Sequence, residues 1–239
     1  MTLGGVRMLD VKEIELQQGT FRMTADFSIN AGARVAVIGP SGAGKSTLLM
    51  ALAGFIAPSH GTLCWQQKDI THSEPSARPF ALLFQDNNLF PHMSVANNVA
   101  LGINPSLKLS ADANKRVGEA LVAVGLEEMG ARKPAELSGG QQSRAALARV
   151  LVQNKPMILL DEPFAALGPA LKLEMLDLVA DLCERTGAGL MMVSHDPADA
   201  RRICADSILV AEGKANAPVA TQSLLDNPPS ALRDYLGTK

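Results

Sequence analysis

Hydrophobic and polar residues alternate strictly along residues 21–29. A period of two is typical of a strand with one buried face, so we expect a half-buried, antiparallel strand near the start of the chain. Residues 34–38 are almost continuously apolar and end at Gly39, which predicts a strand buried on both faces. Residues 46–54 then favour a helix, because Gly54 stands where a glycine commonly follows a helix end.

Strand and helix patterns continue to alternate along the rest of the chain. Short apolar runs at residues 80–84, 157–160 and 190–193 predict further buried strands. Apolar residues at helical spacing predict helices over 111–124, 141–153 and 171–185. An alternation of strand, helix and strand is typical of an α/β fold with a parallel sheet.

One segment of the chain differs in character from its surroundings. Prolines interrupt short helical stretches between residues 86 and 137, so we expect a helical subdomain inserted into a single domain that spans residues 1–239. The tail after Gly213 carries three more prolines and is expected to be less regular.

Composition excludes several classes of protein. The 239 residues are 47% hydrophobic, which excludes global disorder. The net charge of −2 gives no basic footprint, so we expect no nucleic-acid partner. The longest apolar run is residues 48–53, whereas a membrane span needs about 20 residues. The N-terminus lacks the apolar core of a signal peptide, and the three cysteines are expected to be free thiols.

A glycine-rich motif follows the predicted strand at residues 34–38. Residues 39–47 read GPSGAGKST and fit the pattern GxxxxGK[ST]. The glycines let backbone N–H groups surround phosphate oxygens, Lys45 would reach the β- and γ-phosphates, and the Ser46 hydroxyl would bind Mg²⁺. The predicted phosphate-binding residues are Gly39, Pro40, Ser41, Gly42, Ala43, Gly44, Lys45, Ser46 and Thr47.

Polar residues follow three other predicted strands. Asp161 and Glu162 end the apolar run at 157–160, His195 follows the run at 190–193, and Gln85 follows the run at 80–84. The carboxyl ends of parallel strands lie at one edge of a sheet, where ligands gather. There Asp161 and Gln85 are candidate Mg²⁺ ligands, Glu162 a candidate base for attacking water, and His195 a candidate γ-phosphate contact.

A second glycine-rich segment precedes the predicted helix at 141–153. Residues 137–141 read LSGGQ, and a serine with two glycines at a helix N-terminus can bind an anion. The same residues also fit an ordinary helix start capped by Ser138. The residues alone leave both interpretations open.

These elements, in this order, resemble the ATP-binding cassette (ABC) ATPases, of which LSGGQ is the signature. The resemblance implies a P-loop NTPase fold in which a RecA-like parallel core joins an N-terminal antiparallel β subdomain and a helical subdomain. It implies ATP and Mg²⁺ as ligands and catalytic roles for Glu162, His195, Lys45 and Gln85. It also implies a head-to-tail dimer, in which Ser138, Gly139, Gly140 and Gln141 contact the nucleotide held by the second copy.

Within this family the chain resembles the ATPases of bacterial importers, which lie at the cytoplasmic face of the inner membrane. Residues 84–99 resemble the region that docks a membrane-spanning permease, which works with a periplasmic solute-binding protein. Residues 83–109 and residues 40–55 are most similar to ATPases of thiamine importers. Importers of ferric iron, sulfate, molybdate or polyamines remain alternatives, although many of them carry a regulatory domain that we do not expect here. A soluble ABC ATPase outside transport is a further alternative.

Two positions depart from the family pattern. Gly168 stands where the loop after the acidic pair usually has an aspartate, and we expect weaker coupling between the two sites of a dimer. The aromatic residue that usually stacks on adenine has one nearby candidate, Phe21. The alternation at 21–29 places Phe21 on the same face as Met23 and Phe27, which favours packing in the core.

Overall fold

The computed structural model describes residues 7–84 and 88–236. The described strands form a mixed sheet in the order β5-β4-β1-β2-β10-β9-β3-β8-β7-β6, and β11 pairs with β9. The strands are β1 (Arg7–Gln18), β2 (Phe21–Asn30), β3 (Arg34–Ile38), β4 (His60–Trp65), β5 (Lys68–Asp69), β6 (Phe80–Leu83), β7 (Met157–Asp161), β8 (Gly189–Val193), β9 (Asp206–Ala211), β10 (Lys214–Ala215) and β11 (Val219–Ala220).

The sheet combines a parallel part and an antiparallel part, as the sequence predicted. Strands β9, β3, β8, β7 and β6 are neighbours that all run parallel. Strands β2, β1, β4 and β5 pair in antiparallel fashion. The short strand β10 joins the two parts, because it pairs with β2 on one side and β9 on the other.

Helices cover both faces of the parallel strands. Val35 and Val37 of β3 pack in one apolar cluster with α1, and Ala36 and Ile38 pack in another with α4, α5 and α6. Burial on both faces explains why this strand is almost continuously apolar. The helices are α1 (Lys45–Ala53), α2 (Val95–Ala100), α3 (Ala111–Ala123), α4 (Gly139–Leu151), α5 (Pro169–Thr186), α6 (Pro197–Ile203), α7 (Thr221–Asp226) and α8 (Ser230–Leu236).

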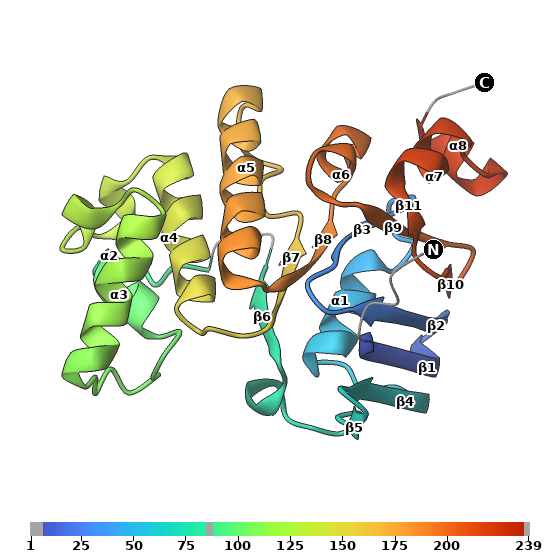
Figure 1. Cartoon of the computed structure of the whole chain (residues 1–239), viewed down its shortest axis with the longest axis horizontal. Helices are drawn as coiled ribbons and strands as arrows, with labels where there is room; N and C mark the ends of the chain where they lie inside the picture. Colours follow the sequence, from blue (N-terminus) through green and yellow to red (C-terminus); the bar gives the residue numbers. More distant parts are fainter. Residues whose placement is uncertain (1–6, 85–87, 237–239) are drawn as a thin grey trace.

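The predicted helices agree with the observed ones to within two residues at most ends. Helix α1 ends at Ala53, and Gly54 follows it in the left-handed conformation with φ 91°. Figure 1 shows α2, α3 and α4 gathered at one end of the molecule and the antiparallel strands at the other, with α5 between them. None of the helices in the described ranges is long and apolar enough to cross a bilayer.

Strand β1 was not predicted, because its alternation changes phase in the middle. Its buried positions are Leu9 and Val11, then Ile14 and Leu16, and the register with β2 shifts between Val11 and Ile14. Glu13 lies at this shift in the left-handed conformation, with φ 49°. A β-bulge of this kind inserts an extra residue into the strand, which breaks the period of two in the sequence.

The tail after Gly213 is more regular than its prolines suggested. It contains β10, β11, α7 and α8, and its Leu224, Leu225 and Leu232 are buried. The pair Pro228 and Pro229 lies between the two helices, so these prolines separate helices instead of preventing them.

All three cysteines are free thiols, as expected. Burial raises the pKa of the Cys183 thiol to about 11 and that of the Cys204 thiol to about 12. The thiolate is the reactive form of cysteine, so these two side chains act as apolar core residues near neutral pH.

A buried arginine fixes the C-terminal end of α1. Arg78 is 2% exposed, and its Nη1 donates to the carbonyl oxygens of Ala51 at 2.9 Å and Leu52 at 2.7 Å. Its Nη2 and Nε donate to the carbonyl oxygens of Thr71 and Ser73. Burial lowers the pKa of the guanidinium. This one side chain pairs with four carbonyl oxygens at the end of α1 and in the loop after β5, and of these the Ala51 oxygen also accepts from the Gly54 N–H.

We predict that Arg78→Met lowers the free energy of unfolding by about 3 kcal/mol, because buried carbonyl oxygens lose their donors. Chemical denaturation of the purified chain measures this change. Arg185→Met is the matched control, since Arg185 forms an exposed ion pair with Asp181 on α5 and should change stability little. Equal stability of the two variants would contradict a structural role for Arg78.

Candidate functional site

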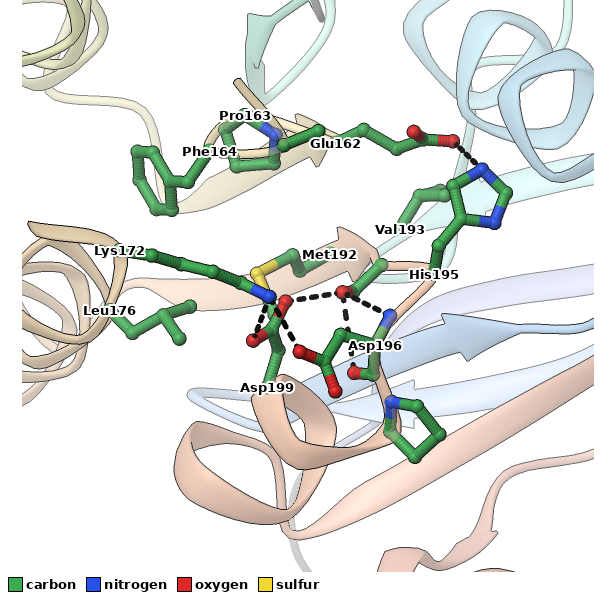
Figure 2. A pocket seen from close by; sticks show the side chains of 13 residues that line it. Glu162, Pro163, Phe164, Lys172, Leu176, Met192, Val193, His195, Asp196 and Asp199 are labelled. Atoms are coloured by element: carbon green, nitrogen blue, oxygen red, sulfur yellow. Dashed lines mark hydrogen bonds and ion pairs between the residues drawn. The ribbon is translucent and has the colours of Figure 1, made fainter. Parts of the chain in front are cut away.

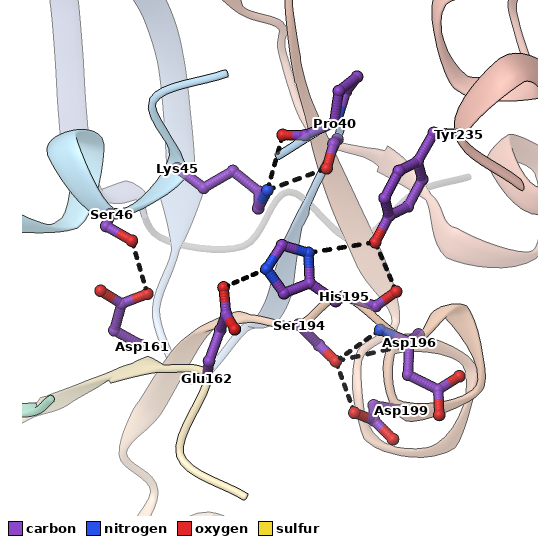
Figure 3. Close-up of polar contacts among 11 residues, drawn as sticks. Pro40, Lys45, Ser46, Asp161, Glu162, Ser194, His195, Asp196, Asp199 and Tyr235 are labelled. Atoms are coloured by element: carbon purple, nitrogen blue, oxygen red, sulfur yellow. Dashed lines mark hydrogen bonds and ion pairs between the residues drawn. The ribbon is translucent and has the colours of Figure 1, made fainter. Parts of the chain in front are cut away.

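The polar residues singled out in the sequence lie at one edge of the sheet. Strand β8 pairs in parallel with β3 on one side and with β7 on the other, and Asp161 stands opposite Val193. The loop that begins at Gly39, the acidic pair and His195 therefore all leave the sheet in the same direction. Figure 3 shows Lys45, Ser46, Asp161, Glu162 and His195 gathered there.

Two glycines of the loop at residues 39–44 are required by their surroundings. Gly39 has φ 149°, and a Cβ atom there would lie 2.0 Å from the carbonyl oxygen of Val210. Gly44 has φ 102°, and a Cβ atom there would lie 2.5 Å from the ring of Phe21. Only glycine fits such close contacts at positive φ, so the loop can wrap tightly from β3 into α1.

Lys45 begins α1 and turns back into the loop. It is 4% exposed, and its Nζ donates to the carbonyl oxygens of Gly39 and Pro40, both at 2.9 Å. Burial lowers the pKa of Lys45, and the carboxylates of Glu162 and Asp161 partly offset this effect. The ammonium group is thus held at the centre of the loop, next to the two carboxylates.

Ser46 and Asp161 place two oxygen atoms together at the next position of α1. The Ser46 hydroxyl donates to Oδ1 of Asp161 at 2.9 Å. Burial raises the pKa of Asp161, whereas this hydrogen bond and the nearby Lys45 and His195 act in the opposite direction. Oxygen donors of this kind suit Mg²⁺, which commonly takes one or two carboxylates and completes its shell with phosphates and water. The described residues contain no group of three or more histidine, cysteine, aspartate or glutamate side chains able to hold a metal.

Glu162 and His195 face each other across the mouth of the site. The Glu162 backbone is left-handed, with φ 48°, and its N–H donates to the Val193 carbonyl at 3.2 Å. Its Oε1 forms an ion pair with Nε2 of His195, whose side chain is 42% exposed. A left-handed glutamate is strained, and strain of this kind is held by the surrounding structure at functional sites.

These residues line a cleft of about 250 Å³. Its walls are Phe21, Ser41, Gly42, Gly44, Lys45, Ser46, Thr47, Glu162 and His195. Phe21 packs against the core formed by β2 and its neighbours, as the alternation predicted. The structure adds that the half-buried ring also reaches the cleft, because Phe21 is the first residue of β2 and its ring lies over Gly44.

A second pocket lies directly behind His195 and was not predicted. Lys172 of α5 bridges two carboxylates of the His195 loop and α6, at 2.8 Å to Asp196 and 2.7 Å to Asp199 (Figure 2). Ser194 donates to Asp199 and accepts from the Asp196 N–H. Burial acts to lower the pKa of Lys172, but its hydrogen bonds to the two carboxylates outweigh burial and raise it. This network fastens the loop that carries His195 to α5.

The LSGGQ segment lies elsewhere in the chain. Ser138 accepts from the Gln141 N–H at 3.3 Å, and the Gln141 side chain accepts from the Ser138 N–H at 2.9 Å. This reciprocal pair is a capping box, which starts α4 and satisfies two backbone donors. None of the residues of this segment is among those that line the cleft, so one chain does not bring Gly139 and Gly140 to it.

Two further positions singled out in the sequence are Gln85 and Gly168. Gln85 lies outside the described residues. Gly168 caps the N-terminus of α5 with no side-chain hydrogen bond, and a Cβ atom there would meet nothing within 4 Å. The backbone at Gly168 has φ −64°, so no steric constraint on the described residues demands glycine at this position.

One contact of the site could not be found from any sequence pattern. Tyr235 of α8 donates a hydrogen bond to the backbone oxygen of His195, and its hydroxyl oxygen lies 3.3 Å from His195 Nδ1. Tyr235 lies 40 residues after His195, in a segment that carries no motif.

Comparison with known proteins gives consistent matches. A family model described as "ABC transporter" matches residues 23–165. Thiamine import ATP-binding protein ThiQ of Cereibacter sphaeroides is 55% identical over 230 residues, which are 96% of this chain and 100% of that protein. The protein of the same name from Ruegeria sp. is 57% identical over 96% of this chain and 100% of its own length. That from Yersinia pseudotuberculosis is 47% identical over 97% of this chain and 98% of its own length.

Solved structures show the same fold. The structure of cbiO1 from Clostridium perfringens, described as part of the ABC transporter complex cbiONQ, superposes with a TM-score of 0.82 at 28% identity. The match covers 93% of this chain and 92% of that one. A nucleotide-free ATP-binding cassette from an ABC transporter gives a TM-score of 0.83 at 24% identity, over 93% and 96% of the two chains. With the glycine-rich loop, the acidic pair and His195 at one sheet edge, these matches show that the chain belongs to the ABC transporter family.

Proposed function

We propose that this chain is the ATP-hydrolysing subunit of a bacterial thiamine importer. The observation that carries the proposal is the convergence of Lys45, Ser46, Glu162 and His195 on one cleft, with Asp161 hydrogen-bonded to Ser46 beside it. The choice of thiamine as the transported solute is supported by the relatives named for thiamine import, which match nearly the whole chain.

Phosphate binding rests on the loop at residues 39–47. Its glycine backbone leaves N–H groups free to surround phosphate oxygens at the positive N-terminal end of α1. On ATP binding, the Lys45 ammonium exchanges its two carbonyl partners for oxygens of the β- and γ-phosphates. Lys45 is buried, so water screens its charge little and the ammonium group acts strongly on a triphosphate bound next to it. The neighbouring carboxylates of Glu162 and Asp161 favour this charged form.

The oxygens of Ser46 and Asp161 are placed to hold Mg²⁺, with Gln85 as a further candidate ligand. The metal, when bound, neutralises negative charge on the β- and γ-phosphate oxygens. Asp161 is half-buried at the end of β7, so its carboxylate position is set by the sheet and not by a flexible loop.

Glu162 and His195 act on the attacking water and the γ-phosphate. The Glu162 carboxylate orients the water and accepts its proton, while the imidazole of His195 contacts the γ-phosphate. Both side chains already face the cleft and each other, which sets them within reach of the same reacting group. A general base of this kind contributes about 100-fold to 10,000-fold to a rate.

The cleft is completed by a second copy of the chain. The LSGGQ segment opens α4 with Ser138 and Gly139 exposed and Gly140 buried, and none of its residues lines its own cleft. In a head-to-tail dimer, Ser138, Gly139, Gly140 and Gln141 of the second copy close over the triphosphate. Closure draws the helical ends of the two copies together, and release of phosphate lets them separate.

The membrane-spanning permease docks beside the helical end of the molecule, on the cytoplasmic face of the inner membrane. Phe90 is 46% exposed, and buried Asn98 fixes its loop by accepting from the Phe90 N–H and donating to the Phe90 and Met93 carbonyls. Phe55 is also exposed, and its ring contacts Phe84. Exposed aromatic side chains on a fixed backbone are typical of a protein interface.

We predict that Glu162→Gln retains ATP binding, lowers the hydrolysis rate at least 100-fold and accumulates as an ATP-bound dimer, because the amide cannot accept the water's proton. Steady-state phosphate release and size-exclusion chromatography with Mg-ATP measure the two effects. Glu119→Gln on the exposed face of α3 is the matched control and should behave as wild type. A Glu162→Gln chain that hydrolyses ATP at the wild-type rate would exclude Glu162 as the base.

We also predict that cells carrying Glu162→Gln in place of the natural chain lose ATP-dependent uptake of labelled thiamine. Uptake of ferric iron, sulfate, molybdate and polyamines, measured in the same cells, should be unchanged. If thiamine uptake persists and one of the other solutes fails to enter, the chain powers a different importer. If every uptake persists while hydrolysis is lost, the ATPase acts outside transport.

A further inference from the structure

The C-terminal helix α8 reaches the candidate catalytic histidine through the single tyrosine of the chain. Leu232 of α8 is fully buried and anchors the helix on the core. One turn further on, Tyr235 lies against His195 with ring centroids 6.5 Å apart (Figure 3). Because its ring is partly buried, the phenol group is held beside the imidazole by packing as well as by hydrogen bonds.

The Tyr235 hydroxyl makes two contacts with the same residue. It donates to the backbone oxygen of His195 and lies 3.3 Å from Nδ1 of the His195 ring. A phenol hydroxyl carries one proton, and the backbone oxygen can only accept. The phenol oxygen is therefore left to accept a hydrogen bond, and its partner Nδ1 must carry a proton.

The opposite side of the imidazole faces the reaction. Nε2 of His195 contacts Oε1 of Glu162, and both side chains line the cleft with Lys45. With Nδ1 held by Tyr235, Nε2 is the ring nitrogen that changes partner when a phosphate group enters. The Glu162 carboxylate can only accept a hydrogen bond, so Nε2 donates to it while Nδ1 donates to the Tyr235 oxygen.

We propose that Tyr235 is a positioning residue for His195, whose hydroxyl holds the imidazole with Nδ1 protonated and Nε2 turned toward Glu162 and the cleft. This inference rests on the proposed role of His195 in ATP hydrolysis. It makes α8 part of the catalytic apparatus, although Tyr235 itself does not touch the reacting atoms.

The phenol group is suited to this task for two reasons. Burial, with the nearby charges of Glu162 and Asp196, raises the pKa of Tyr235, so its hydroxyl keeps its proton across the neutral range. The loop of His195 is already fixed from its other side, where Ser194 and Asp196 join the network around Lys172. That network holds the backbone of the loop, whereas Tyr235 also acts on the ring.

The test compares the wild-type chain with Tyr235→Phe, which removes the hydroxyl and keeps the ring. We expect kcat for ATP hydrolysis to fall about threefold to tenfold, as for loss of one orienting hydrogen bond, with KM for ATP changed less than about twofold. Nitrogen NMR of chains labelled at histidine gives a second readout, and the His195 signals are identified by their loss in His195→Gln. In Tyr235→Phe, the Nδ1 signal should move toward that of an unprotonated nitrogen.

Two further variants separate positioning from packing. Arg233→Gln changes an exposed residue of the same helix and should leave both readouts at wild-type values. Tyr235→Leu removes the ring as well as the hydroxyl. If Tyr235→Phe keeps the wild-type kcat and Nδ1 signal while Tyr235→Leu is impaired, the tyrosine only packs and the proposal is overturned.

The NMR readout does not depend on hydrolysis, so the two proposals fail separately. A wild-type chain without ATPase activity would contradict the proposed function, and the Nδ1 signal would still decide whether Tyr235 sets the protonation of His195. A loss of kcat in Tyr235→Phe without any change at Nδ1 would overturn the positioning role alone.

Discussion

The site depends on the parallel pairing of β3, β8 and β7. This pairing sets three chain segments side by side with their carboxyl ends at one edge, so that residues far apart in sequence, such as Ser46 and Asp161, come into contact. The register is equally important, because Asp161 stands opposite Val193 at the end of the ladder. Side chains alternate between the faces of a strand, so a slip of one residue would turn Asp161 away from Ser46.

Apolar burial on both faces keeps this register fixed. Alternate residues of β3, β7 and β8 belong to the clusters on opposite sides of the sheet, and nearly all of them are fully buried. The same packing supports polar contacts that would otherwise be costly. Arg78 is tolerated in the interior because four carbonyl oxygens satisfy it, and in return it fixes the helix that starts at Lys45.

Contiguous features of the site could be predicted from the sequence, and long-range ones could not. The loop at 39–47, the acidic pair and His195 each follow an apolar run, so strand patterns alone indicated a shared edge. The contacts of Tyr235 and Lys172 with the His195 loop depend on how α8 and α5 pack, which no local pattern records. The bulge at Glu13 breaks the period of two in β1, so the sequence pattern did not indicate this strand. Phe21 contacts both the core and the cleft, because it lies at the start of β2.

The most direct test of this account is the structure of Glu162→Gln with Mg-ATP bound. The account predicts that the Ser46 hydroxyl and the Asp161 carboxylate would hold the metal, with the β- and γ-phosphates on Lys45 and the loop amides. It also predicts Ser138 of a second copy over the same triphosphate. A triphosphate bound away from the loop at residues 39–47, or a closed site formed within one copy, would contradict it.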